Sequence, residues 1–183
     1  DGTLTITATG SDAAGNAAVQ ASKTVTYDDV APVIAIDGTL EGDNKVNSSE
    51  DGHVVVTGTV TVSGVHADLI GKTVNVTLTD ADSLSVSTTA VVLSSGKFVA
   101  EAVDIGAFKD GNITVAANVS DPAGNSTAAS TKTITLDNVV PTISIAGTLM
   151  GDNIVNKGDD DVVVISGTTT NVEDAQNVTV TLT

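Results

Sequence analysis

Aspartate, asparagine and glycine recur in three short motifs, each of which occurs twice in the chain. The pairs are "SDAAGN" and "SDPAGN", "DDVAP" and "DNVVP", and "GDNKVN" and "GDNIVN". Their carboxylate and amide side chains offer the oxygen ligands of which Ca²⁺ takes about six to eight. Zinc or copper suits this inventory poorly, because the chain has no cysteine and only two histidines, His53 and His66. The motifs therefore predict calcium binding.

The candidate metal ligands are acidic or amide residues that fall in predicted loops and linkers. They are Asp28, Asp29, Asp43, Asn44, Asn47, Glu50, Asp68, Asp104, Asp110, Asp121, Asn125, Asp137, Asn138, Asp152, Asn153 and Asp174. Crowded carboxylates without a cation would repel one another and partly retain their protons. Asp28 and Asp137 stand shortly before a proline, where the chain must be extended, and a plain linker would not require an acid there.

Turn formation is the alternative explanation of these motifs. Glycine and asparagine tolerate positive φ, and an aspartate can accept hydrogen bonds from its own backbone, so "DAAGN", "DPAGN" and "GDNxVN" could be simple turns. The run 159–161, "DDD", fits a solvated face, although Asp159 aligns with Glu50 and could take its place as a ligand. The segment "DGNITVAANVSD" lacks the ligand spacing of an EF-hand loop.

Composition excludes several classes of function. The chain has 183 residues, 23 of them acidic against seven lysines, for a net charge of −16. This balance argues against nucleic acid and anionic membrane surfaces as partners, since both need clustered positive charge. No apolar window is long enough to span a membrane, and the first residues do not resemble a signal peptide. Nucleophile and phosphate-binding motifs are missing and both histidines are isolated, so an enzyme is not expected.

The elements that must position these side chains read as short β-strands. Segments rich in Val, Ile and Thr alternate with clusters of Gly, Asp, Asn and Ser, and no amphipathic helix stands out. About seven such strands in roughly 100 residues favour an antiparallel β-sandwich of immunoglobulin-like topology, without a disulfide. The fold class expected is therefore all-β, with tandem sandwiches.

A long internal repeat sets the expected domain organisation. Residues 1–47 align without a gap to residues 110–156, and 25 of the 47 positions are identical. A period of this length is one domain rather than a solenoid unit. We expect residues 1–30 to be the last strands of one repeat, 31–137 a complete repeat, and 138–183 the first strands of a third. The two partial repeats together lack the part equivalent to 80–109.

The complete repeat is expected to place its acidic loops at its two ends. Its predicted strands are Pro32–Ile36, Val54–Val60, Val74–Thr79, one or two within Ser83–Leu93, Lys97–Val103, Asn112–Val119 and Thr131–Leu136. Because successive strands reverse direction, the first, third and fifth loops should gather where the last strand ends, at what we call the C-terminal pole. The other three should gather at the N-terminal pole, where the first strand begins. The candidate ligands would then meet at the junctions between repeats, where the next repeat adds Asn171, Glu173 and Asp174.

The order of these motifs resembles a known family. "DNVVPTISI", "GDNIVN" and "VVVISGT", with "SDPAGN" before the last strand, resemble the bacterial immunoglobulin-like repeats of giant, type I-secreted surface adhesins. The resemblance covers the whole chain. It implies Ca²⁺ at the repeat junctions, a rigid stalk that projects a distant ligand-binding domain, and a location on the bacterial cell surface. It implies neighbouring repeats of the same parent chain as partners.

Two other functions stay open from the sequence. The sandwich itself could bind a partner, although three aromatic residues are few for stacking on sugars. The incomplete end repeats could also complement each other between chains in a head-to-tail filament.

Overall fold

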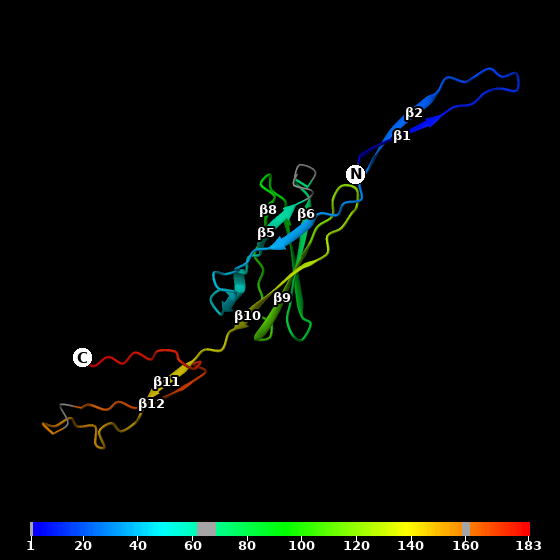
Figure 1. The fold of residues 1–183 in the computed structure, drawn as a ribbon. Coiled ribbons are helices and arrows are strands. Elements are labelled where there is room, and N and C mark those ends of the chain that lie inside the picture. Colours follow the sequence, from blue (N-terminus) through cyan, green and yellow to red (C-terminus); the bar gives the residue numbers. More distant parts are fainter. Residues whose placement is uncertain (1, 62–68, 159–161) are drawn as a thin grey trace. The chain divides into compact units, whose positions relative to one another are not determined.

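Short β-strands make up nearly all of the regular structure. The computed structural model describes residues 2–61, 69–158 and 162–183, and the chain divides into two units, Asp1–Asp137 (unit 1) and Asn138–Thr183 (unit 2). Unit 1 contains a two-stranded hairpin followed by a two-sheet sandwich (Figure 1).

The larger sheet of the sandwich has five strands in the order β4-β10-β9-β6-β7. They are β4 (Lys45–Asn47), β10 (Ser130–Asp137), β9 (Gly111–Asn118), β6 (Thr73–Thr79) and β7 (Ser85–Val91). The β4–β10 pair is parallel, whereas the other neighbours are antiparallel. β9 is therefore the middle strand of this sheet, between β10 and β6.

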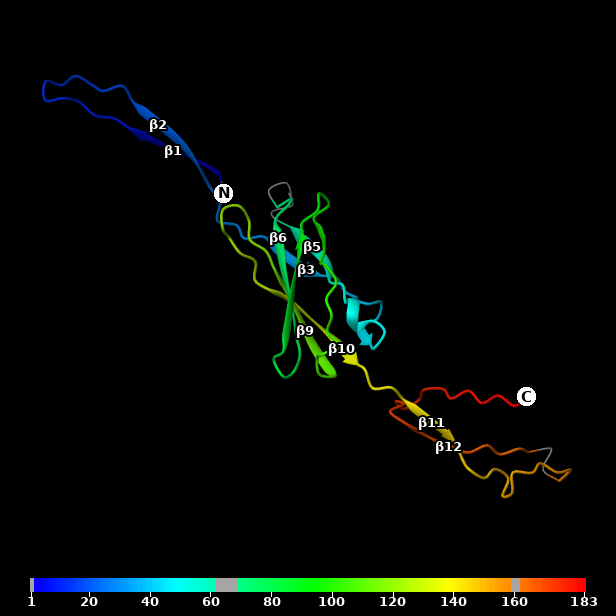
Figure 2. The same ribbon diagram turned by 180° about the vertical axis from the view of Figure 1, so that it is seen from behind.

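The smaller sheet has three antiparallel strands in the order β3-β5-β8. They are β3 (Val33–Ile36), β5 (Thr57–Thr61) and β8 (Lys97–Val99). Figure 2 shows this sheet lying across the larger one. The amide of Ile36 donates to the Ser130 hydroxyl at 3.2 Å, which joins β3 to β10.

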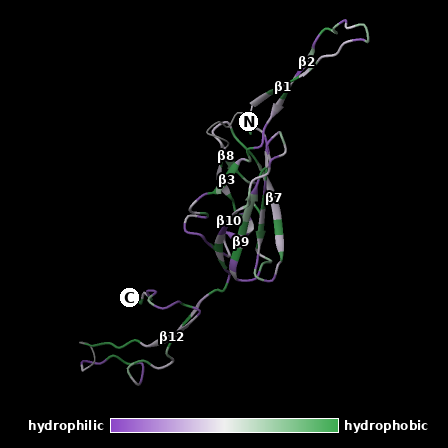
Figure 3. Ribbon diagram, turned by 45° about the vertical axis from the view of Figure 1, so that its right-hand side comes forward, coloured by the Kyte–Doolittle hydropathy of each residue, from purple (hydrophilic) through white to green (hydrophobic). Residues whose placement is uncertain are grey.

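The core lies between the two sheets and follows the two-residue period of the strands. Val74, Val76 and Leu78 on β6 are fully buried, as is Phe98 on β8. The residues between them carry threonine and asparagine side chains toward solvent. Figure 3 shows the resulting mixture of hydrophobic and hydrophilic residues along the strands. Val, Ile and Leu thus fill a core in which Phe98 is the largest fully buried side chain.

A glycine repeated in both units marks a close approach between strands. Gly58 on β5 pairs with Ile36, and a methyl group at this position would collide with the Ala35 carbonyl oxygen and lie 2.6 Å from the Phe98 ring. Gly167 of unit 2 is its repeat counterpart, and a methyl group there would collide with the Ser144 carbonyl oxygen. This explains why "TGT" and "SGT" share their glycine.

The predicted all-β sandwich is confirmed, but the strand expected at Val54–Val60 starts later and the strand expected at Lys97–Val103 ends at Val99. The strand expected at Val54–Val60 begins at Thr57, because the pairing between Val56 and Ala100 is followed by an irregular step. The next pair along the two strands is Val54 with Val103. One residue separates Val54 from Val56, but two residues separate Ala100 from Val103, and this unequal spacing is the geometry of a bulge.

The stretch Ser83–Leu93, expected to hold one or two strands, holds one, β7. β4 is an additional strand in a stretch that was expected to be loop. β4 exists because Val46 is buried and its backbone pairs with β10. A one-turn 3₁₀ helix, Asp51–His53, follows it and carries the exposed His53.

The N-terminal hairpin of unit 1 consists of β1 (Gly2–Ala8) and β2 (Ala21–Tyr27), paired antiparallel from Gly2–Tyr27 to Ala8–Ala21. Its apolar side chains Leu4 and Ile6 are exposed, whereas Val25 is half-buried. The hairpin thus presents an apolar face that the sandwich does not cover.

Unit 2 contains β11 (Thr142–Ile145) and β12 (Gly167–Thr170), which pair antiparallel. The third strand expected near its end, "VTVTLT" at 178–183, is not assigned as a strand, and no described strand pairs with it. A strand requires ladder hydrogen bonds, so this segment keeps the sequence pattern of a strand without the structure. The predicted repeat boundaries at 30 and 137 stay predictions.

Candidate functional site

Three acidic loops of unit 1 meet at the C-terminal pole, where β10 ends. The Ile105 amide donates to the Asp51 carbonyl oxygen at 2.8 Å, which joins loops 100–110 and 37–56. The Thr135 amide of β10 donates to the Asn44 carbonyl oxygen at 2.9 Å. Two of the three loops expected at this pole are therefore in contact in the structure.

Two carboxylates from different loops face one small space at this pole. A methyl group on Gly106 would lie 3.1 Å from Asp51 Oδ2 and 3.2 Å from Asp104 Oδ1. Asp104 Oδ1 also accepts a hydrogen bond from the Gly106 amide at 2.8 Å. We call Asp51, Asp104 and Gly106 the acidic cradle. Glycine leaves room there that any larger residue would fill.

The "GDN" motif builds the same turn in both units. Asp43 and Asp152 each accept, through Oδ1, a hydrogen bond from the amide two residues later, at 2.9 Å in both cases. Asn44 and Asn153 each have a φ of 64°. Their Oδ1 atoms accept hydrogen bonds from the amide four residues earlier, at 2.9 and 2.7 Å. The turn explanation thus accounts for much of this motif.

Asn47 and Glu50 form a second local structure in the same loop. The amide and the side-chain Nδ2 of Asn47 donate to Glu50 Oε2 at 3.1 and 2.7 Å. Asn47 Oδ1 accepts hydrogen bonds from the amide and hydroxyl of Ser49 at 2.8 and 2.6 Å. These bonds fix the loop that leads from β4 to the 3₁₀ helix, and so to Asp51.

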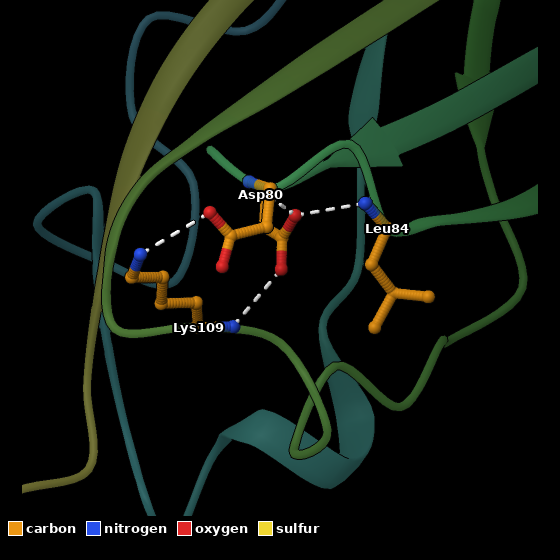
Figure 4. Close-up of polar contacts among 4 residues, drawn as sticks. Asp80, Leu84 and Lys109 are labelled. Carbon is orange, nitrogen blue, oxygen red and sulfur yellow. Dashed lines mark hydrogen bonds and ion pairs between the residues drawn. The ribbon is translucent and has the colours of Figure 1, made fainter.

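The most buried acid at this pole is Asp80, which sequence reasoning did not select. Its Oδ1 accepts from the amides of Asp82 and Leu84, both at 2.9 Å, and its Oδ2 accepts from the Lys109 amide at 3.0 Å (Figure 4). The Lys109 hydrogen bond is the main cause that holds the pKa of Asp80 below its usual value, against the opposing effect of burial. Lys109 Nζ pairs with the exposed Asp82 at 3.1 Å. Asp80 therefore ties loop 80–84 to loop 100–110.

Asp121 and Asn125 form the corresponding structure at the N-terminal pole. The buried Asp121 accepts from the amides of Gly124 and Asn125, both at 2.8 Å, and from Asn125 Nδ2 at 3.0 Å. Burial acts to raise the pKa of Asp121, but these hydrogen bonds outweigh it and lower the pKa below its usual value. Asn125 Nδ2 also donates to the Asp28 carbonyl oxygen at 3.2 Å, which holds loop 119–129 against the linker.

The same turn occurs in the hairpin, at Asp12 and Asn16. Asn16 donates to Asp12 through its amide at 2.8 Å and its Nδ2 at 2.7 Å. The side-chain hydrogen bond is the main cause that lowers the pKa of Asp12. Here the turn is exposed, so it forms without help from a neighbouring linker.

The linker acids Asp28 and Asp29 lie beside the N-terminal pole. Asp28 Oδ1 accepts from the Val30 amide at 3.1 Å, and Asp29 Oδ2 accepts from the Tyr27 hydroxyl at 2.6 Å. The latter bond, which favours the protonated phenol, raises the pKa of Tyr27. The structure therefore brings Asp28, Asp121 and Asn125 together, with Asp29 next to them in the chain.

The remaining candidate ligands lie at the ends of elements. Asp110 precedes β9, Asp137 ends β10 beside the paired residues Gly111 and Leu136, Asn138 opens unit 2, and Asp174 lies in the turn after β12. Asp68, with His66 and the run 159–161, lies outside the described residues.

No cluster of three or more His, Asp or Glu side chains that could hold a metal ion occurs in the described part of the chain. Calcium also takes main-chain and amide carbonyl oxygens and water, so two carboxylates facing one space fit part of such a site. The acidic cradle meets this condition. The metal role of each candidate residue stays a prediction.

Residues 2–61, 69–158 and 162–183 include no helix with the length and apolar character needed to cross a membrane.

Comparison with known proteins adds an independent line of information. No protein-family model matches the chain, and no curated protein matches it. A solved tetra-tandem repeat from the extending region of a large adhesion protein is similar, with 27% identity and a TM-score of 0.50. The match covers 94% of this chain and 40% of that one, so the chain spans less than half of the structure it matches.

Two solved adhesin structures match with TM-scores below 0.5. A Ca²⁺-stabilized adhesin with which an Antarctic bacterium binds ice is 25% identical, at a TM-score of 0.41, over 93% of this chain and 40% of that one. A bacterial immunoglobulin-like domain from the M. primoryensis ice-binding adhesin is 24% identical, at 0.38, over 60% of this chain and all of that one. The chain is therefore an all-β protein with an immunoglobulin-like sandwich, and it is similar over nearly its whole length to the tandem repeats of a large adhesion protein.

Proposed function

We propose that the chain is a non-enzymatic spacer in the stalk of an adhesin on the bacterial cell surface, and that Ca²⁺ at its repeat junctions stiffens it. The observation that carries the proposal is the likeness to tandem repeats of an adhesin extending region, over 94% of the chain. The partners are then the neighbouring repeats of the same parent chain, and a distal domain that the stalk projects binds the ligand.

The acidic cradle supports the calcium part of the proposal. Asp51 and Asp104 come from two loops that meet beside the end of β10, where the chain leaves unit 1. Asp110 and Asp137 flank the last pair of that sheet. Oxygen ligands from several loops at the exit of a repeat are the donor set that calcium prefers.

The charge of the chain supports it as well. A net charge of −16 on 183 residues opposes compaction, and bound cations would relieve the repulsion. Ca²⁺ bound at a pole would neutralise the carboxylates there and link the loops to the adjoining linker. The residues that would hold it are Asp51 and Asp104 at the C-terminal pole, and Asp28 and Asp29 at the other.

Thermal unfolding tests this proposal. Ca²⁺ at about 100 times its dissociation constant should stabilise the folded state by about 2.7 kcal/mol, with a corresponding rise in melting temperature that a chelator reverses. Asp104→Asn should reduce the rise. Glu101→Gln, an exposed acid away from the cradle, should leave it unchanged. Equal melting temperatures with calcium and with chelator would overturn the calcium part.

A further inference from the structure

We propose that Met150 is a site of reversible oxidation, at which conversion of the thioether to a sulfoxide strengthens the hydrogen bond between the turn after β11 and Val164. The proposal goes beyond the calcium-stiffened spacer and does not depend on metal binding. It rests on one structural position that occurs twice in the chain, filled by Glu41 in unit 1 and by Met150 in unit 2.

The turn that carries this position is built alike in both units. Glu41 and Met150 have φ values of 50° and 54°, a region that residues with a Cβ atom adopt uncommonly. The glycine that follows each of them agrees as well, at 87° and 89°, and so does the asparagine two residues beyond the glycine, at 64° in both units. The side chains of Glu41 and Met150 therefore start from the same backbone geometry.

In unit 1 the Glu41 side chain fastens this turn to the segment that leads into β5. Its Oε1 accepts a hydrogen bond from the Val55 amide at 2.8 Å. Val55 is half-buried and lies between Val54 and Val56, whose backbones pair with the segment after β8. A backbone amide that is withdrawn from water needs an acceptor, and Glu41 supplies one.

In unit 2 a methionine sulfur makes the equivalent contact. Met150 Sδ accepts a hydrogen bond from the Val164 amide at 3.2 Å. Val164 is the counterpart of Val55, because the offset of 109 residues that equates Glu41 with Met150 also equates these two valines. A thioether is a weak acceptor, whereas a carboxylate oxygen is a strong one. Unit 2 thus keeps the contact but makes it with the weaker group.

Oxidation gives the methionine side chain a strong acceptor at the same place. A peroxide transfers one oxygen atom to Sδ, so the sulfur loses two electrons and becomes a sulfoxide, while hydrogen peroxide is reduced to water. No bond of the chain breaks. The new oxygen accepts from the Val164 amide as Glu41 Oε1 accepts from the Val55 amide. A sulfoxide can be reduced again enzymatically, so the change is reversible.

The position admits a polar oxygen. A methionine sulfoxide that forms in an apolar core disrupts it, because the product is polar. Here the complete sandwich of unit 1 holds a carboxylate at the equivalent position, and both Glu41 and Met150 are half-buried. A small oxidant therefore reaches the sulfur, and the product need not enter a core.

Peroxide treatment of the full chain tests the proposal, and the composition makes the reaction specific. The chain has one methionine, no cysteine and no tryptophan, so mild hydrogen peroxide should add one oxygen atom, at Met150. We expect the Val164 amide proton to move downfield in the ¹⁵N-correlated NMR spectrum. Its exchange with solvent should slow about two- to tenfold, the range that one hydrogen bond provides. Unchanged or faster exchange after oxidation, or a chain that peroxide does not modify, would overturn the proposal.

Two substitutions at the same position are the controls. Met150→Glu copies the unit 1 contact into unit 2 and should slow exchange of the Val164 amide before any peroxide is added. Met150→Leu removes the acceptor, so exchange should become faster and peroxide should have no further effect. Exchange at Val164 that is the same with leucine as with methionine would show that the sulfur is not its acceptor, and would overturn the proposal.

The complete sandwich offers a second test, by urea unfolding in excess chelator, which keeps the outcome independent of calcium. Glu41→Met combined with Met150→Leu moves the single methionine into unit 1. We expect this chain to unfold at lower urea than one with Met150→Leu alone, and peroxide to restore part of the difference. Met150→Leu alone has no methionine, so peroxide should leave its unfolding unchanged. A further loss of stability when methionine at position 41 is oxidised would contradict the proposed strengthening.

Discussion

The side-chain amide of Asn125 donates a hydrogen bond to the main-chain carbonyl oxygen of Asp28, at 3.2 Å and across 97 residues of sequence. The bond joins the turn between β9 and β10 to the linker that leads into β3. Asn125 is itself held by Asp121. The "DPAGN" turn of the sandwich therefore does more than turn the chain, because it fastens the linker between the hairpin and β3.

Removing this amide should loosen the linker. Asn125→Ala eliminates the bond to Asp28 and one of the bonds to Asp121. We expect backbone order parameters of residues 28–31, measured by ¹⁵N relaxation, to fall from near the rigid value of about 0.85 toward about 0.6.

The hairpin supplies a matched control for this change. Asn16→Ala removes the same side-chain bond, to Asp12, from the counterpart motif. It should leave the order parameters of 28–31 unchanged. Equal loosening by the two substitutions would show that Asn125 does not act through its contact with Asp28.

Gly58→Ala should destabilise unit 1 by about 2–3 kcal/mol, because overpacking a core strand forces shifts in its neighbours. The added methyl group would meet the Ala35 carbonyl oxygen and the Phe98 ring. Gly38→Ala has open space around the new methyl group and should change the free energy of unfolding by no more than about 0.5 kcal/mol. Urea unfolding measures both, and equal effects would contradict the close approach of β3 and β5.

Asp80→Asn should destabilise unit 1 in a pH-dependent way. Three amides donate to the Asp80 carboxylate, and an asparagine would replace one accepting oxygen by a donor. Because folding lowers the pKa of Asp80 from its ordinary value of 3.8, its contribution is fully present above that pH. It is lost as the pH falls through the folded-state pKa.

The difference in unfolding free energy between wild type and Asp80→Asn should therefore be largest near pH 7 and shrink below pH 3.8. Denaturant unfolding across this range measures it. Asp82→Asn is the control, because Asp82 is exposed and its ion pair with Lys109 lies at the surface. A difference that stays constant with pH would mean that ionised Asp80 is not what the loop amides stabilise.

The positions of several strands and the internal repeat could be predicted from the sequence, because they depend on local residue types. Alternation of Val and Thr placed β6, β9 and β10 within a residue or two of their observed bounds. The turn built by Asp43 and Asn44 follows from the same local chemistry, since asparagine tolerates positive φ.

Features that depend on distant partners could not be predicted. β4 has three residues in a stretch rich in Asp and Asn, and it forms because Val46 reaches the core beside β10. Asp80 is indistinguishable in sequence from the exposed loop acids. Its carboxylate accepts a hydrogen bond from the Lys109 amide, 29 residues later. The closeness of Asp51 and Asp104 likewise depends on how the two loops meet, and on the absence of a side chain at Gly106.

Small-angle X-ray scattering tests the central claim most directly. The sample is a protein with residues 29–137 twice in tandem, which keeps the 109-residue period of the repeat across one complete junction. It is measured in calcium and then in excess chelator. We expect a long, narrow distance distribution with calcium that becomes shorter and broader without it. Identical profiles in the two conditions would contradict stiffening by calcium and leave the Asp and Asn motifs as turn-forming elements.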